Sequence, residues 1–177
     1  GEASESEESK AGGWFAENEF GRAGPNGIAI DSQRNIYALD AGGSRVQKFS
    51  SFGLFITQWG GKGSRPGEFY YGKDHGGPMG IAIAGNRVFV TDQGNFRVQV
   101  FTQDGIYSSE FGTEGTGDGQ FLKPTHVAVD SVGHVYVTDW ERRDVQKFVS
   151  SASGYEWALT FGGKETVAHE QGLFYAK

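Results

Sequence analysis

The chain has 177 residues with 29 glycines, no cysteine and a formal net charge of −6. Glycine makes up about 16 % of the chain against a usual ~7 %, yet no Gly-X-Y period is present, which excludes collagen. An aromatic content of 14 % excludes a fully disordered chain. The lack of cysteine excludes disulfides and thiol catalysis, and no apolar run is long enough for a membrane span. This composition is typical of one domain of short strands and tight turns.

Acidic residues are concentrated at the start of the chain. Residues 1–10 (GEASESEESK) contain four glutamates and one lysine, whereas residues 11–177 contain 18 acidic and 15 basic residues. Segment 1–13 has almost nothing apolar to bury, so we expect it to be flexible and solvated, with an acidic docking tail as the alternative. No leader with a basic start and an apolar centre is visible.

The same order of segments occurs three times between residues 27 and 162. Each copy starts with GIAI, GIAI or HVAV, continues through a turn to a β-branched and aromatic segment, and then carries RVQKF, RVQVF or DVQKF before an aromatic-Gly pair. The second segments end in Asp40, Asp92 and Asp139, which lie 52 and 47 residues apart. This is the period of a four-stranded blade, so we predict an all-β fold of antiparallel β-propeller blades.

In chain order, we expect three blades and partial blades at both ends. The blades are predicted over 22–60, 61–112 and 113–162. Segment 14–21 looks like an orphan fourth strand, and 170–174 looks like the start of a further blade, so blade structure is predicted throughout 14–177. Within 20–162 no apolar pattern has the helical period, and almost no helix is expected.

The pattern resembles the NHL repeat, the unit of a β-propeller family. The matching segments are 78–83 (PMGIAI), 88–92 (VFVTD) and 95–101 (NFRVQVF), with the Gly-rich lead-in 115–124. The likeness covers roughly residues 18–175 and recurs in order. The third copy has Asp144 where the others have Arg45 and Arg97, which argues against a uniform Arg–Asp ladder.

Three blades are too few for a closed ring. The resemblance implies closure with about six blades, and propellers in general have four to eight. Open sheet edges invite pairing. The chain could be a fragment of a longer propeller, a half-propeller that closes by dimerising, or a segment that packs on another subunit. We favour assembly or truncation over a stable monomer.

The resemblance implies that the loops between blades share a binding face with the loops between second and third strands. Residues 70–77 form an insertion on this face, and inserted loops often carry function. The candidate contacts are Tyr70, Tyr71, His75, Phe96, Trp140, Arg142 and Arg143. The alternatives are that the insertion only covers a blade junction and that Trp140 packs on a neighbouring blade.

His126 begins an innermost strand and is the one candidate for a metal ligand in the central channel. Peptidyl-amidoglycolate lyases are propellers with similar repeats and a histidine-bound zinc, and 123–130 resembles their repeat. A catalytic zinc needs about three protein ligands, and no two of the four histidines have a short ligand spacing. A structural histidine is therefore expected, and no cofactor is predicted, with channel zinc or calcium as unsupported alternatives.

The recurring aspartates could be mistaken for a carboxylate cluster. Asp40, Asp92 and Asp139 occur once per blade at the end of the second strand, which favours turn capping or pairing with arginine. No Gly-x-Ser-x-Gly or His-Glu-x-x-His motif is present.

We therefore expect a non-enzymatic module that binds a protein partner or assembles with itself. The alternatives are a fragment of a zinc-dependent, lyase-like propeller and a single-stranded RNA-binding domain. Residues 11–177 have a net charge of −3, which disfavours RNA. The Gly- and aromatic-rich strands without cysteine favour an extracellular or exported protein over a cytoplasmic one.

Overall fold

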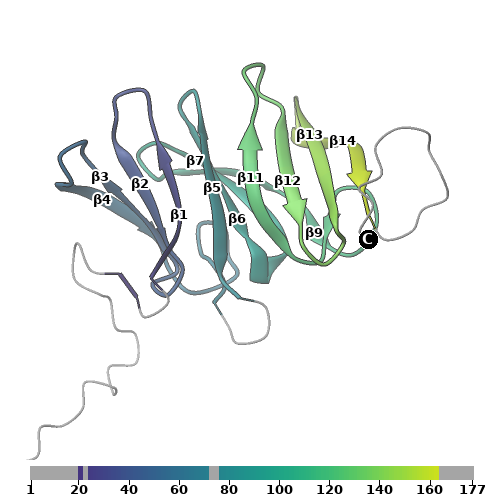
Figure 1. Ribbon diagram of the computed structural model, residues 1–177, viewed down its shortest axis with the longest axis horizontal. Helices are drawn as coiled ribbons and strands as arrows, with labels where there is room; N and C mark the ends of the chain where they lie inside the picture. The colour runs from purple at the N-terminus through teal and green to yellow at the C-terminus, as the bar shows by residue number, and fades with distance from the viewer. Residues whose placement is uncertain (1–19, 22–23, 72–75, 164–177) are drawn as a thin grey trace, which may run out of the picture.

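The computed structural model describes residues 20–21, 24–71 and 76–163. Within them the chain forms three four-stranded antiparallel sheets, each made of consecutive strands, which we call blades 1, 2 and 3 (Figure 1). Blade 1 consists of β1 (Pro25–Ile30), β2 (Ile36–Asp40), β3 (Arg45–Phe49) and β4 (Phe55–Gly60). Blade 2 consists of β5 (Pro78–Ala84), β6 (Arg87–Asp92), β7 (Arg97–Thr102) and β8 (Tyr107–Phe111). Blade 3 consists of β11 (Pro124–Val129), β12 (Val135–Asp139), β13 (Asp144–Ser151) and β14 (Gly154–Gly162).

The register repeats from blade to blade. Asp40 pairs with Arg45, Asp92 with Arg97, and Asp139 with Asp144 at the ends of the second and third strands. The pairing of the third and fourth strands shifts by one residue just before the last phenylalanine of the RVQKF-type segment in every blade. The sequence repeat is therefore a geometric repeat, which confirms the predicted propeller blades.

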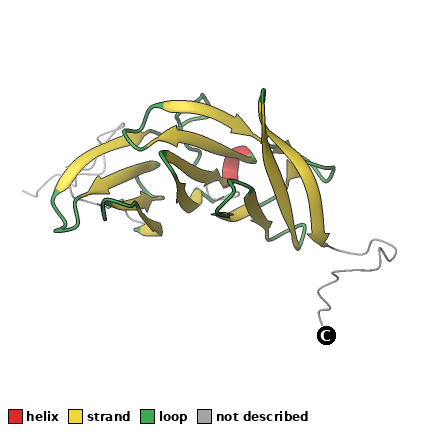
Figure 2. Cartoon of the chain, turned by 90° about the horizontal axis from the view of Figure 1, so that it is seen from above, coloured by secondary structure: helices red, strands yellow, loops and turns green. Residues whose placement is uncertain are grey.

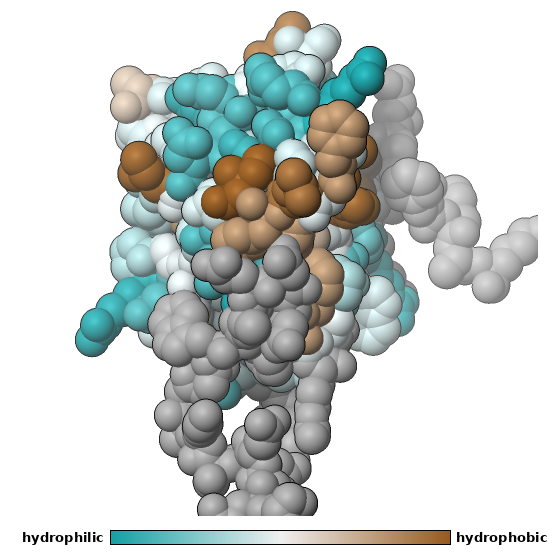
Figure 3. All heavy atoms as spheres, turned by 90° about the vertical axis from the view of Figure 1, so that its left-hand side faces the viewer, coloured by the Kyte–Doolittle hydropathy of each residue, from teal (hydrophilic) through white to brown (hydrophobic). Residues whose placement is uncertain are grey.

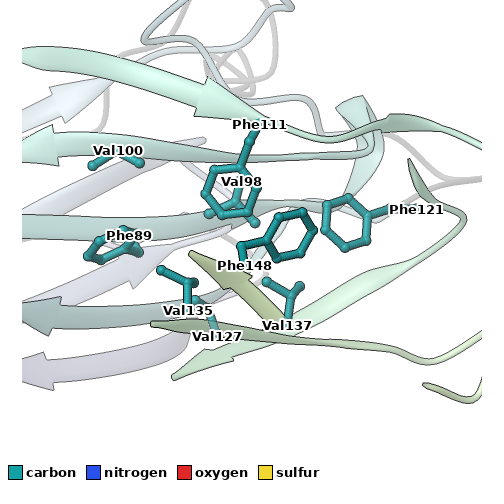
Figure 4. Close-up of a cluster of buried hydrophobic side chains, with 9 residues drawn as sticks. All are labelled: Phe89, Val98, Val100, Phe111, Phe121, Val127, Val135, Val137 and Phe148. Carbon is teal, nitrogen blue, oxygen red and sulfur yellow. The ribbon is translucent and has the colours of Figure 1, made fainter. Parts of the chain in front are cut away.

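The hydrophobic core lies between the sheets. The three sheets stand side by side along an arc (Figure 2), and alternate residues of each strand face opposite neighbours. One buried cluster joins blades 1 and 2 around Tyr37, Phe69 and Phe101. A second joins blades 2 and 3, where Phe111 lies 4.6 Å from Phe148 between ring centres (Figure 4). The middle sheet, blade 2, is buried on both faces, which explains the apolar character of its strands.

Short elements complete the described part. Strands β9 (Thr113–Glu114) and β10 (Gln120–Phe121) pair in parallel within the loop between blades 2 and 3. The only helical segment there is the three-residue 3-10 turn Gln93–Asn95, which confirms the expectation of almost no helix. No helix in these residues is long and apolar enough to cross a membrane. Segments 1–13 and 170–174 and most of 14–21 lie outside the described residues, so the expectations for them stay predictions.

Candidate interaction face

Two kinds of loop meet at one end of the blades, the lower end in Figure 1. The loops from β2 to β3, β6 to β7 and β12 to β13 contact the longer loops that join successive blades. The amide of Trp140 donates to the carbonyl of Lys123 at 3.0 Å, and the side chain of Asn95 donates to the carbonyl of Gly63 at 3.0 Å. We call this surface the loop face; its described residues are 40–45, 60–71, 76–78, 92–97, 112–124 and 139–144.

One buried aspartate per blade holds both kinds of loop in place. Asp40 accepts hydrogen bonds from the amides of Gly21 and Gly43 and from Arg45 Nε at 3.1 Å. Asp92 accepts from the amide of Tyr70 and from Arg97 Nε at 2.9 Å. Turn capping and arginine pairing are thus both present, and the aspartates lie in separate blades.

Burial raises the pKa of the Asp92 carboxyl, and its hydrogen bonds from Asn95 and Arg97 oppose that rise. Such a buried carboxylate must be paired to be tolerated, because an isolated charge in the interior is costly. Its partners include the amide of Tyr70 in the neighbouring loop, so the charge also fixes the position of that loop.

In blade 3, different residues hold the two kinds of loop in place. Asp139 accepts from four backbone amides, those of Leu122, Lys123, Glu141 and Arg142. Asp144 occupies the position of the arginines of the other blades, and Arg142 Nε lies 2.8 Å from its carboxylate. The sequence predicts that the Arg–Asp pairs are not uniform from blade to blade, and this exchange confirms it.

Trp140 and Arg143 are exposed on the loop face. The Trp140 side chain is 68 % exposed, its backbone is fixed by the capped turn, and Lys123 Nζ lies 4.8 Å from its ring centre. Arg143 is exposed and has a left-handed backbone with φ of 63°. Arg142 is different, since its side chain is 9 % exposed and its guanidinium also donates to the carbonyl of Gly117 at 2.8 Å. Arg142 therefore supports the turn.

The aromatic residues of the other loops are half-buried. Tyr70 packs so closely on Gly94 that a Cβ at that glycine would lie 2.1 Å from the ring. Tyr71 similarly covers Gly77, and Phe96 packs against the core between blades 2 and 3. This packing favours the alternative that the inserted loop covers a blade junction. His75 lies outside the described residues.

Lys123 is the residue of this face that the sequence reasoning missed. It stands directly before Pro124 in the Gly-rich lead-in, and there its amide is bound by Asp139 while its side chain lies over Trp140. The sequence shows only that Lys123 lies in the loop that precedes an inner strand. It does not show that Trp140, which belongs to a different loop, lies beside it.

The histidines do not form a zinc site in the described residues. His126 is exposed on β11, and no group of three or more His, Cys, Asp or Glu side chains suited to a metal is present in that part of the chain. His134 Nδ1 lies 2.9 Å from Asp130 Oδ2 and serves the β11–β12 turn. This donor set does not supply the three ligands of a catalytic zinc.

A cleft also lies at the opposite end of the blades. It has a volume of about 530 Å³ between blades 2 and 3, and its lining includes Arg87, Asp130 and Tyr155. Arg87 donates to the hydroxyl of Tyr155 at 2.7 Å. Because this arginine already bridges the two blades, the cleft is part of their junction.

Comparisons with known proteins agree with the blade architecture. A family model of the NHL repeat matches residues 23–49, and a model described as a 6-bladed beta-propeller matches residues 74–157. The chain is 27% identical over 118 residues to Protein brain tumor of Drosophila melanogaster, covering 65% of this chain and 10% of that protein. It is 29% identical over 138 residues to NHL repeat-containing protein 3 of Homo sapiens, covering 70% of this chain and 39% of that protein. The chain thus spans well under half the length of these relatives.

Solved structures show the same fold at low identity. A streptogramin B lyase structure matches with a TM-score of 0.52 and 18% identity over 76% of this chain and 39% of that one. A chain of a nidogen/laminin complex matches with a TM-score of 0.52 and 22% identity over 84% of this chain and 50% of that one. These similarities establish a propeller architecture that serves proteins of different activities.

Proposed function

We propose that this chain, which contains NHL-type β-propeller repeats, is a non-enzymatic module that binds a protein partner through its loop face. The observation that carries the proposal is Trp140, a large aromatic side chain that is 68 % exposed on a turn held by a buried carboxylate. Exposed tryptophans on rigid supports are common anchors of protein interfaces, because they bury much area at little entropic cost.

The chemistry around Trp140 indicates the kind of partner. The ammonium of Lys123 lies over the indole ring of Trp140. The exposed Arg143 follows in the same turn, and Glu141 lies between Trp140 and Arg143 in the sequence. An apolar side chain of the partner would cover the indole, and carboxylates beside it would pair with the two cations. The proposed partner is thus a protein segment that combines an apolar residue with acidic neighbours.

Selection from a phage-displayed random peptide library on the immobilised full chain tests this proposal. We expect the selected peptides to contain an apolar residue flanked by acidic ones. Trp140→Ala should weaken their binding, measured by calorimetry, by at least about tenfold. Phe52→Ala is the matched control, because Phe52 is 89 % exposed but lies in the β3–β4 turn, away from the loop face. Unchanged affinity in the Trp140 variant would refute the proposal.

A further inference from the structure

The cleft between blades 2 and 3 lies at the upper end of the blades in Figure 1, away from the loop face. It opens between the β5–β6 turn of blade 2 and the β11–β12 turn of blade 3, and it has a volume of about 530 Å³. Its lining combines apolar side chains with the guanidinium of Arg87. The hollow on the side of blade 1, where Figure 3 shows hydrophobic residues gathered, has no charged side chain in its described lining. The cleft is therefore the better candidate for a site that selects a ligand by charge.

At the junction of blades 1 and 2, polar side chains of blade 1 fill the corresponding place. Lys48 stacks on Tyr37 at 5.1 Å, and its Nζ donates to the carbonyl of Gln103 in blade 2 at 3.1 Å. Blade 2 has Phe89 and Val100 at the positions of this tyrosine and lysine, and both face blade 3. The second junction thus lacks the hydroxyl and the ammonium, and it stays open where the first one is filled.

Arg87 reaches into this cleft because its own turn does not bind it. It takes the position of Asn35 in blade 1 and of His134 in blade 3, whose side chains both hydrogen-bond to an aspartate of their turn. Blade 2 has Ala84 at the position of that aspartate. The guanidinium instead donates to the hydroxyl of Tyr155 in blade 3 at 2.7 Å.

Tyr155 belongs to a hairpin that is longer in blade 3 than in the other two blades. Strands β13 and β14 have 8 and 9 residues, whereas β7 and β8 have 6 and 5. The ring of Tyr155 lies 5.5 Å from that of Phe89 between ring centres, and Arg87 lies over it at 5.9 Å. One aromatic side chain thus holds the guanidinium by a hydrogen bond and by its ring, so the arginine is positioned in advance of any ligand.

The charges of the lining favour an anion. Asp130 also lines the cleft, but it accepts four hydrogen bonds from its own blade at 2.9 to 3.1 Å, which occupy the accepting positions of both carboxylate oxygens. In the described part of the chain, Arg87 has the Tyr155 hydroxyl as its hydrogen-bond partner, and its other N–H groups are not taken up. The charged group of this cleft with unused hydrogen-bonding capacity is therefore the arginine.

We propose that this cleft binds a small organic carboxylate with an apolar body. The carboxylate pairs with Arg87, whose planar fork matches two carboxylate oxygens, and Ile83, Phe89 and Val129 provide the apolar wall. A volume of about 530 Å³ is typical of small-ligand sites. The negative charge of Asp130 in the same lining favours the single charge of a carboxylate over the double charge of a phosphate monoester. The site is separate from the loop face and goes beyond the proposed function.

A nuclear magnetic resonance titration of the isotope-labelled full chain with 3-phenylpropanoate tests the proposal. We expect saturable shifts of the amide signals of residues 84–87, 130–133 and 155, with a Kd on the order of millimolar, as is usual for a ligand of this size. The neutral 3-phenylpropanamide should bind at least about tenfold more weakly, because it cannot form the charge-assisted pair. The doubly charged 2-phenylethyl phosphate should bind no more tightly than the carboxylate.

Three variants separate the charge of Arg87 from its bridge to blade 3. Arg87→Gln should weaken the binding of 3-phenylpropanoate by at least about tenfold, and Tyr155→Phe by less than about threefold, because it removes the bridge and keeps the charge. Arg34→Gln is the matched control, since Arg34 is exposed in the corresponding turn of blade 1 and does not line the cleft. The amide spectrum of each variant reports whether it is folded.

Four results would overturn the proposal. The first is the absence of saturable shifts at the cleft, and the second is equal binding of the amide and the carboxylate. The third is tighter binding of the phosphate, which would make the site one for a dianion. The fourth is an equal loss of binding in Arg87→Gln and Tyr155→Phe, because the arginine would then act only as a bridge between the blades.

Discussion

Single carboxylates hold the turns between the first two strands of blades 1 and 3. Asp31 accepts from the amide and side chain of Asn35 and from the Tyr37 hydroxyl. Asp130 makes the same three contacts with His134 and Tyr136, so histidine replaces asparagine as a donor. Blade 2 has no such aspartate, because its turn is shorter and Gly85 has a positive φ of 56°.

We predict that the stability conferred by Asp130 disappears in acid. Desolvation would raise the pKa of this carboxyl, but the hydrogen bonds from the backbone and ring of His134 outweigh it and lower the pKa from 3.8 to about 2. A lowered folded-state pKa stabilises the fold above the unfolded pKa, and this contribution is lost as the pH falls through the folded value. The difference in Tm between the chain and Asp130→Asn should therefore be constant from neutral pH to about 4 and shrink towards pH 2.

Circular dichroism melts at a series of pH values measure this difference. Asp118→Asn, at an exposed position in the loop between blades 2 and 3, is the control and should leave Tm unchanged. A gap between the chain and Asp130→Asn that stays the same at the lowest pH at which both fold would contradict the assignment.

In blades 2 and 3, the glutamine of the RVQ-type segment ties the blade to the loop that enters it. Gln99 accepts from the amide of Gly67 at 2.8 Å and donates to the carbonyl of Glu68 at 2.7 Å. Gln146 repeats both bonds with Gly119 and Gln120. The Gly-rich loops are thus held as part of the sheet although only two short parallel strands form within one of them.

We predict that Gln99→Leu destabilises the chain by about 1–3 kcal/mol, because it leaves a loop amide and a carbonyl without their partner. Gln103→Leu is the control: Gln103 also makes a side-chain hydrogen bond, to Gly85, but at an exposed site. That substitution should cost less than about 0.5 kcal/mol. Urea unfolding compares the two, and equal costs would show that the tether does not contribute.

The molecule as a whole is an array in which each blade packs only on its neighbours. Trp59 of blade 1 lies between Tyr37 and Phe101, at 6.1 and 6.0 Å between ring centres, and so spans the first junction. In blades 2 and 3 the equivalent residues are Phe111 and Phe161. Stability in such arrays depends on the junctions as much as on the single repeats.

Substitutions of Trp59 should separate its size from its polarity. Its Nε1 is buried and finds no hydrogen-bond partner in the described part of the chain. Trp59→Phe should therefore stay within about 1 kcal/mol of the parent, whereas Trp59→Ala should lose about 2–4 kcal/mol by opening a cavity at the junction. Equilibrium unfolding gives both values; a large loss in the phenylalanine variant would mean that the indole nitrogen is bound.

The repeat allowed the blades and the role of the recurring aspartates to be predicted from sequence. Strand order, the antiparallel sheets and the turns at Gly53 and Gly105, both with positive φ, follow from local patterns that recur three times. The candidate face was predicted less completely. Trp140 is exposed as an interface anchor would be, but Arg142 is bound to Asp144 and to Gly117 of the loop that enters blade 3, and Lys123 was missed. Such contacts join different loops, and no local spacing encodes them.

The sequence by itself determined that this protein is made of propeller blades, because period-2 alternation and turn chemistry act over a few residues. Only the tertiary structure decided which faces of those blades are satisfied. The same isoleucine-rich face is covered in blade 2 and exposed in blade 1, and the same inner position is a required glycine in blade 2 and a histidine in blade 3. The physical reason is that burial depends on the neighbouring sheet, which a residue's own pattern does not specify.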